Sequence, residues 1–186
     1  MPHDPGPAID ADRYRAVLGR FVTGVTVVTT LDDASGAPLP FGTTVNSFSS
    51  VSLDPPLVLI TIGRERSIHP VLARTCRFAV NILAEEGQGL SDCFAGAPSA
   101  IPRTDFCGAG WRPSEHGMPL LDDALAWVDC VLERTIEAGD HTIYLGRVVG
   151  LDGSDRQDWP LLYFRRQYLR IEHAEIVELR GKPDET

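Results

Sequence analysis

The sequence predicts one domain with a mainly β fold: a split β-barrel of antiparallel strands with short helical insertions. Six or more β-rich runs follow one another along the chain, and only short helices fit between them. No predicted strand leads into a GxGxxG turn and a long helix, which argues against a doubly wound dinucleotide-binding fold. A length of 186 residues suits one domain with a substantial apolar core.

The first part of the chain changes from a helical to a β-type pattern. Residues 1–9 hold three prolines and predict a loose arm, after which Asp10 can cap a helix over residues 11–20. The runs GVTVVTTL and FGTTVNSFSSVSL, separated by the turn-rich DDASGAPLP, predict a β-hairpin. Asp-Pro-Pro at residues 54–56 breaks the chain before LVLITI, which predicts a buried strand.

The second part alternates short helices with strands. Ser67 can cap a helix over IHPVLART, and the buried strand FAVNIL precedes a short helix around GLSDCFAG. Residues 97–119 predict an irregular segment, and a loop of that length usually has a functional or interface role. The long β-type runs LAWVDCVLERTIEAG and HTIYLGRVVGLDG meet at Gly139 and Asp140, a pair that suits a tight turn. The runs LLYF and YLRI complete a domain over residues 10–172 and leave a tail over 173–186.

The composition argues against several classes of function. A formal net charge of -9 lacks the basic footprint of nucleic-acid binding and disfavours anionic membranes. No apolar run approaches the roughly 20 residues of a membrane span, and the polar N-terminus lacks a signal peptide's apolar core, so we expect a cytoplasmic protein. The sequence contains neither HExxH nor GxSxG, and its histidines are widely spaced, which predicts no metal site and no hydrolase.

The four cysteines are far apart in the sequence. They are Cys76, Cys93, Cys107 and Cys130, and they form no CxxC pair. We therefore expect reduced and mostly buried thiols, with neither a zinc site nor a redox dithiol.

Three features could form a ligand site. In TTVNSFSSVS, residues 43–52, seven of ten side chains are hydroxyls or an amide, whereas a half-buried strand is polar on one face only. Such groups suit a ligand with many acceptors, but they also occur on ordinary exposed strands. Ser67, preceded by Arg64 and Arg66, could bind a phosphate or simply cap a helix. His141 could contact a second ligand at the barrel rim or be a solvated turn residue.

Taken in order, these segments resemble the flavin reductase family of the split-barrel flavin-binding fold. Its members are the reductase components of two-component flavin monooxygenases and halogenases. The resemblance runs from about residue 14 to residue 171 without a departure in the core motifs. It rests on FVTGVTVVTT, TTVNSFSSVSLDPPLVLI, the Ser67 region, FAVNIL, LSDCFAG, WRPSEHGMPLL, ALAWVDC, AGDHTIYLGRV and PLLYFRRQYLRI.

The resemblance implies a flavin site built around the polar stretch. It assigns to the flavin Thr30, Thr44, Val45, Asn46, Ser47, Ser49, Ser50, Val51, Ser67, Phe94 and Arg103. Ser67 is expected to bind the flavin phosphate, and Arg103 to reach the phosphate or pyrophosphate. The family's GDH motif corresponds to residues 139–141, which implies that His141 meets the nicotinamide and that Tyr168 helps to close that site.

The reaction that the resemblance implies is hydride transfer from NADH or NADPH, with NADH as the expected donor, to FAD or FMN. The cofactors carry this chemistry, so we expect His141 to position the nicotinamide and no general base to be required. Reduced flavin would then pass to a separate monooxygenase or halogenase, and the reductase would be a homodimer. Two alternatives remain: a module that holds flavin as a fixed prosthetic group, and an oxidase or deazaflavin-dependent reductase on a similar barrel.

Overall fold

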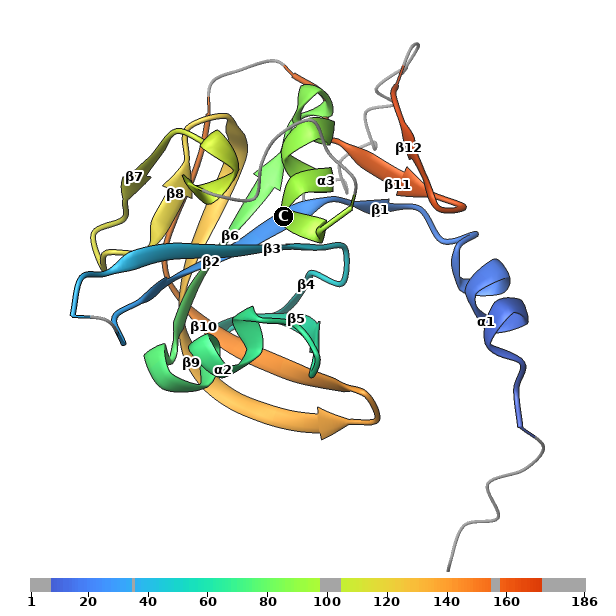
Figure 1. Cartoon of the computed structure of the whole chain (residues 1–186), viewed down its shortest axis with the longest axis horizontal. Helices are drawn as coiled ribbons and strands as arrows, with labels where there is room; N and C mark the ends of the chain where they lie inside the picture. The colour runs from blue at the N-terminus through green and yellow to red at the C-terminus, as the bar shows by residue number, and fades with distance from the viewer. Residues whose placement is uncertain (1–7, 35, 98–104, 155–157, 172–186) are drawn as a thin grey trace, which may run out of the picture.

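A seven-stranded antiparallel sheet forms the centre of the molecule (Figure 1). The computed structural model describes residues 8–34, 36–97, 105–154 and 158–171. The strand order is β3-β2-β6-β9-β10-β5-β4. The strands are β2 (Thr26–Asp32), β3 (Leu39–Val45), β4 (Ser49–Leu53), β5 (Pro56–Gly63), β6 (Arg77–Leu83), β9 (Ala124–Ala138) and β10 (His141–Gly153). The predicted mainly β, antiparallel architecture with short helices is confirmed.

The longest strands, β9 and β10, form the hairpin that the sequence predicts. Gly139 has a φ of 63°, in the left-handed region that favours glycine, so the turn suits a residue without a Cβ. His141 pairs with Ala138 across the hairpin and with Gly63 of β5 on its other side. This register brings the end of the hairpin next to the end of β5.

The predicted β-rich run over residues 41–53 is divided between the two edges of the sheet. β3 pairs with β2, as predicted, whereas β4 pairs with β5. A single hairpin arm over this run is therefore wrong, because residues 46–48 turn the chain from one edge to the other. Ser47 joins the edges: its Oγ accepts a hydrogen bond from the Thr61 N–H at 3.0 Å and donates to the Thr61 carbonyl at 3.1 Å. Among the described residues, the Ser47 side chain therefore joins the β3–β4 turn to β5, where no backbone ladder does so.

Three short α-helices decorate the sheet. α1 (Ala11–Leu18) follows Asp10, as predicted, and the Asp10 carboxylate accepts a hydrogen bond from the Arg13 N–H at 2.8 Å. In Figure 1, α3 (Gln88–Ala95) lies above the β2–β3 pair and α2 (Ile68–Thr75) lies below it. None of the helices in the described part of the chain is long and apolar enough to cross a membrane.

Small elements complete the fold. They are β1 (Thr23–Gly24), β7 (Trp111–Pro113), β8 (Pro119–Leu121), β11 (Leu162–Phe164), β12 (Gln167–Leu169) and the 3₁₀ helices η1 (Glu85–Gly87) and η2 (Asp105–Gly108). The segment over residues 97–119, expected to be irregular, contains η2 and β7 and ends at the first residue of β8, with which β7 forms a hairpin. Its prolines and glycines conceal these three- and four-residue elements, which are too short to show a hydrophobic period.

Buried Asn81 ties three strands together in the core. Its side-chain amide donates to the Val27 carbonyl and to Thr29 Oγ1, both at 3.1 Å, while its oxygen accepts from the Leu121 N–H at 2.8 Å. The residue is 0% exposed. A buried amide is stable only with such partners, so Asn81 fixes how β6, β2 and β8 pack.

A disulfide joins Cys93 of α3 to Cys107 of η2, with a Cα–Cα distance of 6.1 Å. The expectation of reduced thiols is wrong for this pair, because the fold brings together two short helices whose proximity the sequence does not show. Cys130 is a buried free thiol, as expected, whereas the free thiol of Cys76 is exposed.

Candidate active site

A polar cavity of about 160 Å³ lies where the two edges of the sheet meet. It is lined by residues 43–47, residues 61–63, Arg66 and His141. The fold therefore brings four residues of the predicted flavin set, Thr44 to Ser47, together with the residue predicted to meet the nicotinamide. The turn between β3 and β4 and the tip of the β9–β10 hairpin position them.

Two hydroxyls of this cavity, those of Thr44 and Ser47, are held by the protein, whereas its amide is free. Thr44 Oγ1 donates to the Ser91 carbonyl of α3 at 2.6 Å, and Ser47 is held by Thr61 as described above. The Asn46 side chain is exposed and forms no hydrogen bond with the described residues. An amide carries two donors and an acceptor, so Asn46 is the group in this cavity best able to bind the polar edge of a ligand.

His141 lies at the rim of the cavity and is oriented by its neighbour in the chain. Its Nδ1 lies 2.8 Å from Asp140 Oδ1, and a hydrogen bond from His141 lowers the pKa of Asp140 below that of a free aspartate. A carboxylate only accepts, so Nδ1 carries the proton and Nε2 is left free. The ring lies over Gly63, where a Cβ would be 3.7 Å from Nε2.

A second cavity, of about 230 Å³, begins on the other side of Gly42 and Ser67. Its remaining lining consists of Pro40, Phe41, Phe94, Phe106 and Cys107. Ser67 precedes α2, but its hydroxyl makes no capping hydrogen bond, so the predicted side-chain cap is wrong and the group is available to a ligand. Ser67 and Phe94, which the sequence associates with the flavin, thus share one cavity.

Tyr168 lines a third cavity, also of about 230 Å³, with Thr44, Asn46 and Arg66. Its hydroxyl donates to Asp92 Oδ1 at 2.8 Å and lies 2.9 Å from Ser91 Oγ. Burial is the main cause that raises the pKa of Tyr168 to about 12, so it stays a neutral hydroxyl. Tyr168 and His141 therefore line different cavities, the third and the first, and Asn46 lines both.

The amino-acid sequence of this chain matches the flavin reductase like domain over residues 18–172. The chain belongs to the flavin reductase family. The resemblance that the sequence motifs suggest is therefore confirmed.

Individual relatives agree with the family. The reductase subunit HsaB of a flavin-dependent monooxygenase from Rhodococcus jostii is 40% identical over 177 residues, covering 95% of this chain and 86% of that protein. A probable flavin reductase from Rhizobium meliloti is 41% identical over 146 residues, or 78% of this chain, but this chain spans only 44% of that longer protein. The structure of the NADH:FAD oxidoreductase SgcE6 from Streptomyces globisporus, in complex with NAD and FAD fragments, matches with a TM-score of 0.75 and 35% identity. That match covers 89% of this chain and 97% of SgcE6.

The three cavities of this flavin reductase family member lie close to one another in the chain and carry free polar groups. The first and third share Thr44, Asn46 and Arg66, and the second is lined by Gly42 and Ser67, which are chain neighbours of Thr43 and Arg66 in the first lining. The free amide of Asn46 and the free hydroxyl of Ser67 would meet an acceptor-rich ring edge and a phosphate.

Arg66, which the sequence suggests only as positive charge beside Ser67, is a further candidate site residue. It lines the first and third cavities, and its Nη1 donates to the Ala95 carbonyl at the end of α3 at 2.9 Å. Thr61 and Gly63 were missed, because LVLITI predicts only a buried strand. The pairing of β5 with β10 reveals their role, and no sequence pattern encodes that pairing.

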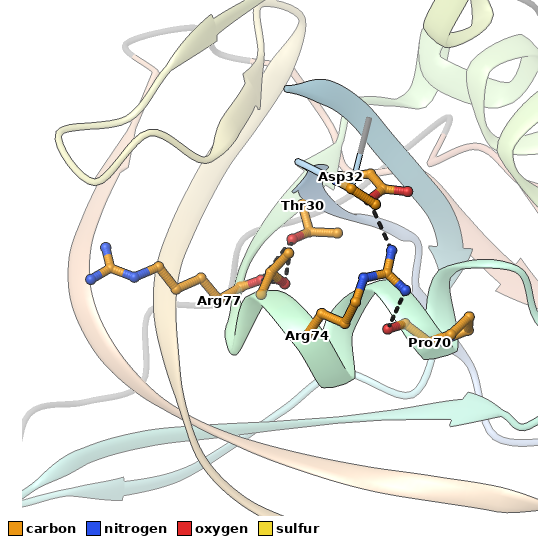
Figure 2. Close-up of polar contacts among 7 residues, drawn as sticks. Thr30, Asp32, Pro70, Arg74 and Arg77 are labelled. Atoms are coloured by element: carbon orange, nitrogen blue, oxygen red, sulfur yellow. Dashed lines mark hydrogen bonds and ion pairs between the residues drawn. The ribbon is translucent and has the colours of Figure 1, made fainter. Parts of the chain in front are cut away.

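Thr30 lies apart from the cavities, although the resemblance assigns it to the flavin wall. It is 0% exposed, and Figure 2 shows its hydroxyl directed at the backbone of Arg77, with a hydrogen bond of 2.8 Å to that carbonyl. Nearby, Arg74 bridges Asp32 at 2.8 Å and the Pro70 carbonyl at 3.2 Å. This network fastens α2 to β2 and leaves the Thr30 hydroxyl engaged. Arg103 lies outside the described residues.

A large apolar groove of about 1000 Å³ borders the site on the side of α1. Asn46, Ser47 and Ser49 line it together with α1 and residues 163–166. Ser50 and Val51, the remaining predicted flavin residues, are exposed on β4. In Figure 1, α1 stands away from the sheet beside the β11–β12 hairpin, and none of its residues is buried.

Proposed function

We propose that this chain is an NADH:flavin oxidoreductase that reduces a flavin and releases it to a separate oxygenase. The observation that supports the proposal is the meeting of the first and third cavities at Thr44, Asn46 and Arg66, with His141 at the rim. When bound, the nicotinamide supplies a hydride and the flavin accepts it, so the protein has to align the two.

The side chains divide this task by position. Asn46 offers its free amide to the pyrimidine edge of the flavin, where hydrogen-bond donors stabilise developing negative charge. Arg66 and the Ser67 hydroxyl bind the phosphate beside α2. His141, with Nδ1 held by Asp140, presents Nε2 to the nicotinamide from the outer side. Tyr168 holds α3 in place through Asp92 and thereby positions the Ser91 carbonyl that binds Thr44.

The candidate site is open to solvent on one side, which would allow reduced flavin to leave. Asn46, Ser49 and His141 are exposed in the chain, so a flavin bound there keeps one face accessible. A cytoplasmic location fits a donor such as NADH. A separate monooxygenase is the proposed acceptor, in line with the name of the HsaB relative.

We also infer that two copies of the chain pair over the apolar groove. Tyr14 and Leu18 of α1 are 55% and 52% exposed and Phe21, after the helix, is 75% exposed, so large apolar side chains on this side of the groove remain uncovered. The substitution Phe21→Asp should yield a monomer by light scattering where the unmodified chain yields a dimer. Because Phe21 is exposed, the fold itself should survive, and an unmodified chain that is monomeric would refute the pairing.

The test of the proposed activity is a turnover assay that combines NADH and NADPH with riboflavin, FMN and FAD. We expect saturable oxidation of NADH that depends on added flavin, and no such dependence would refute the proposal. His141→Ala should raise the KM for NADH roughly tenfold, because one oriented contact is lost. Arg112→Ala is the control, since this exposed side chain of β7 lies outside the three cavities.

A further inference from the structure

The disulfide between Cys93 and Cys107 lies beside the candidate flavin site, although the proposed reaction does not use it. Cys93 is 0% exposed and Cys107 is 4% exposed. Cys107 also lines the cavity that contains Ser67. The bond therefore joins α3 to a wall of the site.

The bond holds a short segment in a backbone conformation that side chains disfavour. Phe106 and Cys107 have φ values of 57° and 58°, in the left-handed region where a Cβ crowds the backbone. Such a conformation persists only when surrounding contacts hold it. Here those contacts are the bond to Cys93 and the packing of Phe106 against Phe94 and Trp111, with ring centroids 5.1 and 6.1 Å away.

The same contacts reach the flavin cavity through Phe94. Its ring packs directly on the backbone of Gly42, since a Cβ at Gly42 would lie only 2.7 Å from Phe94 Cε1. Gly42 precedes Thr43 and Thr44, which line the cavity that contains His141. Phe106 and Phe94 thus form a continuous series of contacts from Cys107 to β3.

We propose that Cys93 and Cys107 form a reversible thiol–disulfide pair that sets how tightly the site holds its flavin; this inference rests on the proposed function. In the disulfide form the aromatic wall is preformed, so binding does not have to order it and flavin is held tightly. In the dithiol form Phe106 and Cys107 are free to leave the left-handed region, and flavin binds more weakly and departs sooner. Disulfides in a reducing compartment are usually transient and often sense oxidants.

Hydrogen peroxide is the oxidant that fits, because reduced flavin that reaches no oxygenase reacts with O₂ to give oxidised flavin and peroxide. One cysteine sulfur attacks peroxide, the O–O bond breaks, and a sulfenic acid and water form. The second sulfur attacks the sulfenic sulfur, the S–S bond forms, and a second water leaves. Two thiols and one peroxide thus give one disulfide and two waters. The tighter site would then retain flavin while unused reduced flavin accumulates.

The experiment compares the two forms of the full-length protein. One sample is reduced with dithiothreitol and the other is treated with stoichiometric peroxide, and mass spectrometry of peptides verifies the state of Cys93 and Cys107. Calorimetric titration with FAD and with FMN then gives the dissociation constants. We expect the oxidised form to bind roughly five- to tenfold more tightly.

Variants separate this pair from the other thiols. Cys76→Ser should keep the redox response, because Cys76 is an exposed free thiol. Cys93→Ser should abolish it, and Cys107→Ser checks the same point if the first variant folds poorly. Equal affinities of two verified forms would overturn the proposal, as would a response that survives Cys93→Ser or a failure of peroxide to form the disulfide. A protein that binds no flavin in either state would refute the proposed function as well.

Discussion

The substitution Gly42→Ala tests the contact between β3 and the aromatic wall. The new Cβ would lie 2.7 Å from Phe94 Cε1 and 2.9 Å from Cδ1. That is about 1 Å short of the 3.5–4.0 Å at which carbon atoms attract each other. The Phe94 ring cannot swing away freely, because it is 4% exposed, packs against Phe106 and follows the cross-linked Cys93. We therefore expect a displaced ring and a loss of stability.

The magnitude follows from overpacking. Adding a methyl group to a packed core costs about 1–3 kcal/mol, whereas replacing glycine by alanine within a strand by itself gains roughly 0.5–1 kcal/mol. Gly150→Ala on β10 provides the matched control, since its Cβ would have ordinary contacts of 3.6 Å to Trp127 and 3.7 Å to Asp129. Relative to that control, Gly42→Ala should lower the free energy of unfolding by about 1–3 kcal/mol.

Urea unfolding followed by circular dichroism measures this difference. With a slope of about 2 kcal/mol per molar urea, the midpoint of Gly42→Ala should lie roughly 0.5–1.5 M below that of Gly150→Ala. The affinity for flavin should fall only in Gly42→Ala. Equal midpoints for the two variants would show that Phe94 adapts at no cost, and coupling from Phe94 to β3 would then lose its structural basis.

Three other perturbations address separate parts of the molecule. Burial and the neighbouring acid raise the pKa of Cys130 to about 12, so iodoacetamide at pH 8 should label Cys76 and spare Cys130 in the native protein; rapid labelling of both would contradict the buried thiol. Asn81→Leu leaves the buried backbone groups that now bond the Asn81 amide without a partner. The free energy of unfolding in urea should therefore fall by at least about 1–3 kcal/mol. Asp140→Asn should raise the KM for NADH, because the carboxylate that orients His141 is lost. A KM for NADH in Asp140→Asn equal to that of the unmodified protein would exclude this role for Asp140. The pKa of Asp140 is lowered in the folded protein, so the stabilising contribution of its carboxylate is complete above the ordinary carboxyl pKa and is lost as the pH falls through the lowered value.

Much of the fold is readable from the sequence because its strands are rich in β-branched residues and its turns carry glycine, proline and aspartate. The polar stretch around Asn46 is also recognisable in the sequence, because polar groups on both faces of the predicted strand break the expected alternation. The pairing of strands is a different matter. Nothing local indicates that the chain changes sheet edge at residues 46–48, that His141 lies opposite Gly63, or that Cys93 meets Cys107.

The contacts of individual side chains depend on such long-range pairing. The hydroxyl of Thr30 resembles the other threonines of the set in sequence, yet it faces the start of β6 and is held by Arg77. Tyr168, for which the resemblance implies a role in closing the nicotinamide site, has its hydroxyl against α3 because the β11–β12 hairpin places it there. In both positions, the three-dimensional course of a strand decides which neighbours a side chain meets.

At the candidate site, the spacing between the β3–β4 turn and β5 depends on the Ser47 hydroxyl and its two hydrogen bonds to Thr61. A continuous ladder would fix the spacing of two strands at one value, whereas the two hydrogen bonds of one side chain can be exchanged for others at a cost of about 0.5–1.5 kcal/mol each. Substitutions at residue 47 could therefore widen or narrow the entrance without unravelling the pairing on either flank. The breadth of acceptor flavins would then be tunable at one position, while the rest of the framework stays unchanged.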